Sequence, residues 1–147
     1  MILRLEKGYI VAGHDTDGTT MPQDLGLDGP LRRRAGPYAG QRALLSVTAQ
    51  SPDRGQLVGL QVDAGDSPLP VGAHVVDLAS NGSTRSAGFV TSSGWSPTLK
   101  RPVALGLVRA GLRRVGERVE LRHLGGRMQA TISTPCALDP AGSRLHE

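Results

Sequence analysis

The sequence predicts a mainly β protein, with a small α+β part over residues 1–50 and six short strands over residues 51–147. From residue 56 onward, short apolar runs recur at regular intervals between turn residues, a pattern typical of a small barrel or sandwich. The chain also has 20 glycines and 10 prolines among 147 residues, but only one Trp, two Tyr and one Phe. We therefore expect a turn-rich protein whose core consists mainly of Val, Leu and Ala.

The first 50 residues predict short elements. Residues 3–8 have the pattern of the last turn of a helix, closed by Gly8 at a position where left-handed geometry is common. Because isolated helices below about 12 residues are marginal, we expect this turn to continue a helix from upstream of Met1. The apolar run over residues 9–13 predicts a buried strand. A polar loop and two short helical segments are expected over residues 14–20, 21–27 and 39–45.

The remainder of the chain predicts six strands. They are expected over residues 56–62, 73–78, 85–92, 101–108, 118–122 and 128–133. Asn81 and Gly82 lie between the second and third strands, and this pair favours a tight hairpin turn because both residues accept positive φ. We expect the boundary between the two parts of the chain within residues 49–55.

Composition narrows the classes of function. The formal charge is +4 and the isoelectric point is near 10.0, yet no nucleic-acid motif or pair of stacking aromatics accompanies the scattered arginines, so we expect no nucleic-acid partner. No apolar run approaches the ~18 residues of a membrane span, and the N-terminus has no signal-peptide pattern. The single cysteine, Cys136, forms no internal disulfide framework or cysteine-rich zinc site. A cytoplasmic location is the default expectation.

Asp15 and Asp17 belong to an Asp-Thr-Asp-Gly-Thr motif that resembles the nucleophile loop of haloacid-dehalogenase-type phosphatases. The lysine and the later acidic cluster of that chemistry have no counterpart in this chain, and a calcium loop would need further acidic ligands. We therefore expect a turn whose carboxylates accept backbone N–H bonds. The histidines have no metal-ligand spacing, and we predict no metal site and no catalytic residue.

Several segments in order resemble the aminomethyltransferase family, which includes the glycine-cleavage T-protein and the C-terminal part of the heterotetrameric sarcosine oxidase alpha subunit. The N-terminal ones read Leu-Arg-Leu-Glu-Lys-Gly-Tyr, Asp-Thr-Asp-Gly-Thr and Pro-Gln-Asp-Leu-Gly-Leu, and the later ones cover residues 40–44, 88–99, 102–108 and 139–145. The alpha subunit is the closer resemblance. It implies that residues 1–50 are a remnant of the central folate-binding domain and that residues 51–147 form a six-stranded antiparallel barrel of the aminomethyltransferase type.

The resemblance also implies site residues. Glu6 corresponds to the glutamate that accepts N–H groups of the pterin ring, and Arg32, Arg33 or Arg34 would pair with a folate carboxylate. The alternatives are a helix-end Glu6 paired with Arg4 or Lys7, and a solvated arginine turn. The family's catalytic aspartate would lie upstream of Met1, and Asp28-Gly29 replaces a tryptophan of many relatives.

The implied function is one-carbon transfer from an oxidised N-methyl amine such as sarcosine to tetrahydrofolate, which gives methylene-tetrahydrofolate. FAD, FMN and NAD would belong only to a complete multi-subunit oxidoreductase with sarcosine oxidase-type partner subunits. We expect this chain alone to be inactive, because the region of the catalytic aspartate is not within it. The alternative is a non-catalytic barrel module that docks onto a flavin-bearing partner subunit.

Overall fold

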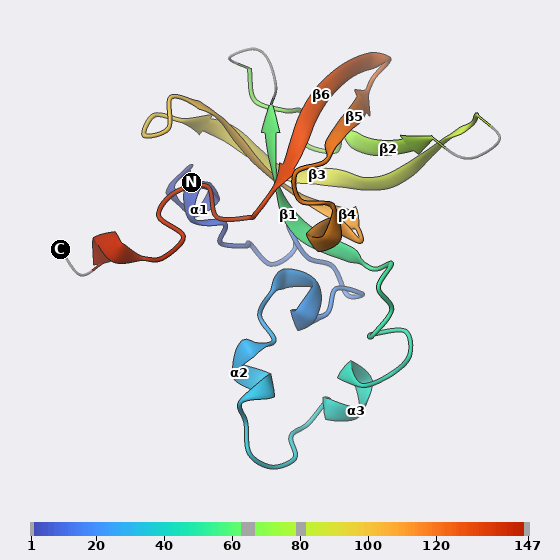
Figure 1. Ribbon diagram of the computed structural model, residues 1–147, viewed down its shortest axis with the longest axis vertical. Coiled ribbons are helices and arrows are strands. Elements are labelled where there is room, and N and C mark those ends of the chain that lie inside the picture. The colour runs from blue at the N-terminus through green and yellow to red at the C-terminus, as the bar shows by residue number, and fades with distance from the viewer. Residues whose placement is uncertain (1, 63–66, 79–81, 146–147) are drawn as a thin grey trace.

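Six antiparallel strands close into a barrel in the order β1-β4-β3-β2-β5-β6, with β6 returning to β1 (Figure 1). The computed structural model describes residues 2–62, 67–78 and 82–145. The strands are β1 Gly55–Val62, β2 His74–Leu78, β3 Thr84–Ser96, β4 Arg101–Arg109, β5 Arg118–His123 and β6 Gly126–Ser133. All six predicted strands are confirmed. They form a closed barrel, which is one of the two forms that the strand pattern predicts and the form that the resemblance implies.

The barrel interior is aliphatic, as the composition predicts. Leu60, Val75, Val90, Leu121 and Ile132 are among its fully buried side chains, and they come from five different strands. Along β5, buried Val119 and Leu121 alternate with more exposed neighbours, as expected of a strand with one face toward the core. At Gly59 in β1, an added Cβ would lie 2.4 Å from the carbonyl oxygen of Thr134, so only glycine fits there.

Strand β3 is longer than the sequence predicts. It continues to Ser96 by pairing with β4, whose Arg101 lies opposite Ser96. The Ser-Ser-Gly-Trp-Ser run has no apolar alternation, so its strand character comes from the partner strand. A register shift between Val90 and Ser92 bends the strand in its middle. The Asn81 half of the predicted hairpin turn lies outside the described residues, but β2 and β3 pair as expected, with Leu78 opposite Thr84.

The N-terminal part is helical where we expected an α+β arrangement. It contains α1 Ile2–Lys7, η1 Pro22–Leu25, α2 Gly29–Arg32 and α3 Gln41–Leu44, where η denotes a 3₁₀ helix. Gly8 follows α1 with φ of 71°, which confirms the glycine helix end. The buried strand over residues 9–13 is wrong: Tyr9 is 61% exposed, and only an isolated bridge joins Ala12 to Thr16. No neighbouring strand within the described ranges satisfies this backbone, and an apolar run needs such a neighbour to become a strand.

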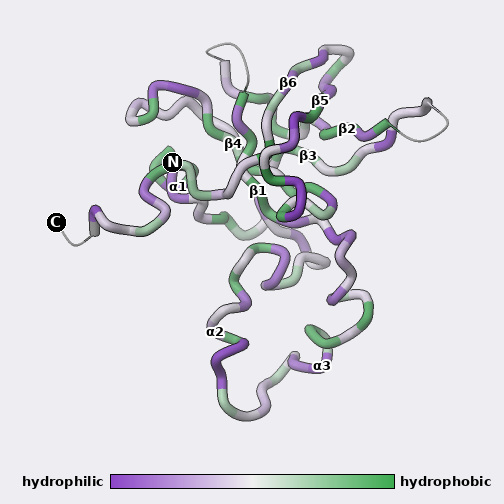
Figure 2. The backbone as a smooth tube through the Cα atoms, viewed as in Figure 1, coloured by the Kyte–Doolittle hydropathy of each residue, from purple (hydrophilic) through white to green (hydrophobic). Residues whose placement is uncertain are grey.

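The helix α1 packs against the outside of the barrel. Leu5 forms a second apolar cluster with Leu57, Val103 and Leu105, which lie on β1 and β4. Beyond it, the segment carrying α2 and α3 extends away from the barrel (Figure 1). Its hydrophilic colouring is strongest near α2, at the consecutive arginines (Figure 2). No helix among the described residues is long and apolar enough to span a membrane.

Candidate functional site

Glu6 lies on α1 with only 2% of its surface exposed. Its carboxylate oxygen Oε1 accepts a hydrogen bond of 2.5 Å from the Ser96 hydroxyl, and the Ser96 oxygen in turn accepts the Leu99 N–H at 2.9 Å. The Glu6 carboxylate therefore fastens α1 to the end of β3. The alternative pairing of Glu6 with Arg4 or Lys7 is wrong, because these cations bind Asp15 and Asp139 instead.

The three candidate arginines lie at and beyond the end of α2, and all are exposed. The Arg32 side chain is 80% exposed and donates to Asp28, one helical turn earlier. The Arg34 guanidinium lies 5.7 Å from the centre of the Tyr38 ring, within cation–π range. No hydrogen bond or ion pair within the described ranges joins this cluster to Glu6.

A groove of about 610 Å³ lies between η1, α2, α3 and the approach to β1. Arg32, Tyr38 and Gln41 supply polar groups to it, while Leu31 and Leu44 supply apolar surface. This volume is in the range of pockets that hold drug-sized ligands. Of the predicted site residues, the groove includes Arg32 and not Glu6.

Asp15 is the centre of a buried network that sequence reasoning recognised only in part. Its carboxylate accepts the Val11 N–H at 2.9 Å, which confirms the expected turn, but it also accepts the Ser92 hydroxyl at 2.7 Å and the Thr91 hydroxyl. Arg4 completes the network, with Nη1 2.5 Å from Asp15 and Nη2 2.6 Å from Ser92. Burial raises the pKa of Asp15, but these hydrogen bonds outweigh it and hold the pKa below the ordinary value.

Asp17, the second aspartate of the motif, behaves as the turn hypothesis predicts. Its Oδ1 accepts the Thr19 N–H at 2.8 Å and the Thr19 hydroxyl at 2.7 Å. Hydrogen bonds from the Thr19 side chain and backbone lower the Asp17 pKa. The motif therefore stabilises its own loop through Asp17 and connects that loop to β3 through Asp15. No group of three metal-ligating side chains occurs within residues 2–62, 67–78 and 82–145.

Asp24 and Arg54 form a second buried ion pair, which no sequence pattern predicted. Asp24 is almost fully buried, and both of its carboxylate oxygens contact Arg54, at 2.9 Å and 2.6 Å. Arg54 also donates to the Thr19 carbonyl oxygen at 2.7 Å. The pair connects η1 to the residue before β1, so it joins the N-terminal part to the barrel. Three acidic residues of the N-terminal segment, Asp15, Asp24 and Asp28, thus pair with arginines.

Lys7 and Asp139 connect α1 to the C-terminal segment. Lys7 Nζ lies 2.9 Å from Asp139 Oδ2 and 2.8 Å from the Asp139 carbonyl oxygen. The hydrogen bond from Lys7 is the largest influence on the carboxyl group, and together with bonds from Ser143 it lowers the pKa of Asp139 to about 2. The Asp139 carboxylate therefore stays ionised at all but strongly acidic pH.

This pair should weaken as the pH falls from about 4 towards 2. Because the folded-state pKa of Asp139 lies below its ordinary value of 3.8, its ionised form stabilises the fold above that value and loses this effect as the pH approaches 2. The Ser143 N–H donates to Asp139 at 2.9 Å, so its NMR shift should titrate with a midpoint near the Asp139 pKa of about 2. In Lys7→Met the midpoint should rise. A midpoint that is the same in both proteins would contradict this assignment.

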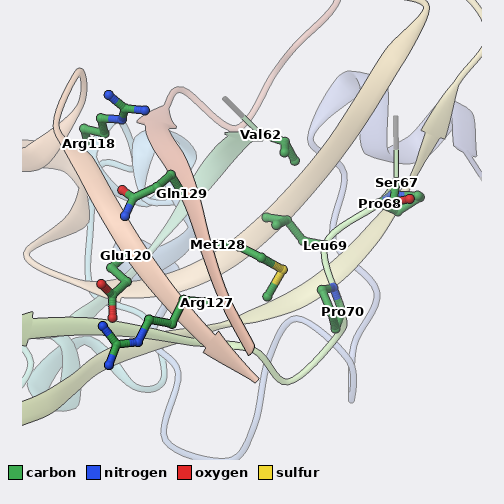
Figure 3. Close-up of a pocket in the computed structure, with 10 residues that line it drawn as sticks. All are labelled: Val62, Ser67, Pro68, Leu69, Pro70, Arg118, Glu120, Arg127, Met128 and Gln129. Atoms are coloured by element: carbon green, nitrogen blue, oxygen red, sulfur yellow. The ribbon is translucent and has the colours of Figure 1, made fainter. Parts of the chain in front are cut away.

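A separate cavity of about 600 Å³ lies beside β5 and β6 (Figure 3). Val62, Leu69 and Met128 form its apolar part, and Glu120 and Arg127 belong to its polar rim. Val62 and Met128 also pack against the barrel core. None of the residues singled out from the sequence lines this cavity.

Comparisons with known proteins agree with the fold. Residues 56–139 match the family model for the glycine cleavage T-protein C-terminal barrel domain. The chain is 36% identical over 146 residues to a sarcosine oxidase subunit alpha of Corynebacterium sp. (strain P-1), covering 97% of this chain and 15% of that subunit. It is 34% identical to an aminomethyltransferase of Prochlorococcus marinus (strain MIT 9313), covering 88% of this chain and 33% of that protein.

The structural comparison extends the agreement to the N-terminal part. The crystal structure of glycine cleavage system aminomethyltransferase T from Bartonella henselae superposes with a TM-score of 0.74 at 28% identity, covering 94% of this chain and 37% of that one. The chain thus spans about a third of the similar aminomethyltransferases and a smaller share of the alpha subunits. With its closed six-stranded barrel and the match over residues 56–139, the chain belongs to the glycine cleavage T-protein C-terminal barrel family.

Proposed function

We propose that this chain forms the C-terminal part of a sarcosine oxidase alpha subunit-like aminomethyltransferase and contributes to tetrahydrofolate binding. The observation that carries the proposal is the similarity to sarcosine oxidase subunit alpha over 97% of the chain, because it includes the N-terminal residues as well as the barrel. In this proposal residues 1–50 belong to the folate-binding domain and residues 51–147 form the barrel beside it. The cytoplasmic location remains a prediction.

Two groups of residues fit the chemistry of a folate. Glu6 offers a carboxylate with almost no contact with water, and such a group is a strong acceptor for the N–H donors of a pterin ring. The exposed Arg32, Arg33 and Arg34 offer donors for the carboxylates of the glutamate tail. Bound tetrahydrofolate would accept the one-carbon unit. The role of this chain would be to bind and orient it, and we assign no catalytic group to these residues.

A second candidate function is a non-catalytic module that docks onto a flavin-bearing partner subunit. It is favoured by the position of Glu6, whose Oε1 is already bound by Ser96 inside the structure. In that case Glu6 would hold α1 against the barrel and would not contact a ligand. FAD, FMN and NAD would be held by other parts of the assembled enzyme in either case.

Titration of the full chain with tetrahydrofolate by calorimetry, under reducing conditions, distinguishes these functions. Folate binding through Glu6 predicts that Glu6→Gln weakens the affinity by roughly tenfold to a hundredfold, since a hydrogen bond to a charged group contributes about 1.5–3 kcal/mol. The matched control is Glu117→Gln, which removes an exposed carboxylate that pairs with Arg114 and should leave the affinity unchanged.

The same titration tests the arginines. Arg32→Ala, Arg33→Ala and Arg34→Ala are compared with Arg42→Ala, an exposed arginine on α3. At least one of the three should weaken binding more than the control does. No measurable affinity of the unaltered chain would favour the docking module, and tetrahydrofolate-dependent turnover by this chain alone would contradict the assignment of catalysis to other parts of the enzyme.

A further inference from the structure

Glu6 is held at two points by residues that lie far along the chain. Its carboxylate oxygen Oε1 accepts the hydroxyl of Ser96, which is 90 positions away and belongs to β3. Its carbonyl oxygen accepts the N–H groups of Ala137 and Leu138, at 2.9 Å and 2.8 Å. The side chain and the backbone of Glu6 are therefore both fixed by the barrel and by the segment that follows the barrel.

One face of β3 receives the helix α1. Because side chains alternate between the two faces of a strand, Ser92, Gly94 and Ser96 share one face. An added Cβ at Gly94 would lie 3.0 Å from Ile2 Cδ1, so the glycine lets the helix lie close to the strand. Ser92 Oγ accepts a hydrogen bond of 2.6 Å from Arg4 of the same helix. Ser92 and Ser96 are thus two buried hydroxyl groups through which β3 holds α1.

The neighbours of Ser96 determine the direction of its hydrogen bond to Glu6. The Ser96 oxygen accepts the Leu99 N–H at 2.9 Å, and its hydroxyl donates to Glu6 Oε1 at 2.5 Å. A serine hydroxyl has one proton, and an ionised carboxylate only accepts hydrogen bonds. Ser96 therefore occupies Oε1 and holds the carboxylate in one orientation.

The other carboxylate oxygen of Glu6, Oε2, is left for a further donor. No hydrogen bond between the residues that the structure describes ends on Oε2. The fully enclosed side-chain atoms without a partner in that part of the chain are Arg4 Nε and Ser93 Oγ, so Oε2 still reaches the surface. A carboxylate that is almost fully buried is costly unless its oxygens are hydrogen-bonded. Oε2 is therefore the Glu6 atom that would bind an N–H donor of a ligand most favourably.

We propose that Ser96 is a positioning residue, which holds Oε1 of Glu6 so that Oε2 is presented to the N–H donors of a pterin ring. This inference rests on the proposed contribution of the chain to tetrahydrofolate binding. A side chain that is already fixed loses less conformational freedom when a ligand binds. The barrel would thus increase the affinity through Ser96, although Ser96 itself does not contact the ligand.

Calorimetric titration of the full chain with tetrahydrofolate, under reducing conditions, tests the proposal. Ser96→Ala removes the hydroxyl and should weaken the affinity roughly fivefold to tenfold, the effect of one hydrogen bond. The matched control is Ser92→Ala, because Ser92 is buried on the same face of β3 and holds the same helix through Arg4. Its affinity should stay within about twofold of that of the unaltered chain, since Glu6 keeps its partner. The control separates a general loosening of α1 from the loss of the bond to Glu6.

Hydrogen exchange of the unaltered chain provides a measurement that needs no variant to fold. A ligand bound at Oε2 should fix Glu6 and, through it, Ser96, so the Leu99 amide bonded to Ser96 should exchange more slowly when tetrahydrofolate is saturating. The comparison is the Gly116 amide, which donates to the Ile132 carbonyl oxygen and should slow by a smaller factor.

The outcomes distinguish this inference from the proposed function. If the unaltered chain does not bind tetrahydrofolate, the proposed function fails and the role of Ser96 fails with it. If Glu6→Gln weakens binding but Ser96→Ala weakens it no more than Ser92→Ala does, only the role of Ser96 is overturned. The same conclusion follows if the ligand slows exchange at Leu99 no more than at Gly116.

Discussion

Replacing Asp15 by alanine should lower the free energy of unfolding by about 3 kcal/mol, the lower part of the range for breaking a buried ion pair. The substitution leaves the Arg4 guanidinium without its carboxylate partner and removes the acceptor of the Thr91 and Ser92 hydroxyls. Because Arg4 is itself mostly buried, water replaces the lost contacts only in part. For a chain of this size the melting temperature should fall by about 10 °C.

Asp17→Ala is the matched control, because it removes the other aspartate of the same motif. Asp17 is exposed, and its bonds go to Thr19 and Thr20 within its own turn. Urea unfolding should therefore show a much smaller decrease in the free energy of unfolding for Asp17→Ala than for Asp15→Ala. Equal losses would mean that the motif stabilises only its local turn and that the contact with β3 contributes nothing.

Replacing Arg54 by alanine should lower the free energy of unfolding by a similar amount, about 3 kcal/mol, because it leaves the buried Asp24 carboxylate without its partner. The pair joins η1 to the start of the barrel, so the N-terminal part should lose the most local stability. Hydrogen exchange should show faster exchange in residues 21–25 at denaturant concentrations where the barrel amides remain protected.

Arg113→Ala is the control for this change. Arg113 pairs with Asp53 at 3.6 Å, and both side chains are mostly exposed, so its removal should cost less than about 1 kcal/mol. Combining Arg54→Ala with Asp24→Asn should recover part of the loss, because no unpaired buried charge remains. If the decrease in unfolding free energy of the double variant equals the sum of the decreases in the two single variants, Arg54 and Asp24 are not directly coupled.

The barrel strands were predictable because each carries its own local signal. β5 and β6, for example, have apolar side chains at alternating positions and a Gly-Gly turn between them. Prediction failed where the local signal and the strand pairing disagree. The end of β3 at Ser93–Ser96 has no apolar alternation and is a strand because β4 lies beside it. The apolar run over residues 9–13 is not a strand, because within the described residues its only β-pairing is the isolated bridge from Ala12 to Thr16.

At the candidate site, too, some residues could be predicted from the sequence, whereas their partners could not. Glu6 was singled out by resemblance, and the structure places it in a buried position that the folate proposal can use. Its partner, Ser96, could not be predicted, because the two residues are 90 positions apart and neither has a sequence pattern that identifies the other. The Asp15 motif was predicted to form a local turn, yet its larger role depends on Thr91 and Ser92, which are 76 and 77 positions away in the chain.

By itself, then, the sequence determined the order of the strands along the chain, the aliphatic core, the glycine end of α1 and the family resemblance. These features follow from periodicity, turn chemistry and motifs, which depend only on residues close together in the sequence. The six-stranded antiparallel barrel that the resemblance implies is confirmed, but only the tertiary structure decided the order of its strands, with β1 beside β4 and β6. It also decided which charges are buried in pairs, since Asp15 and Asp24 can leave water only where folding brings Arg4 and Arg54 to them.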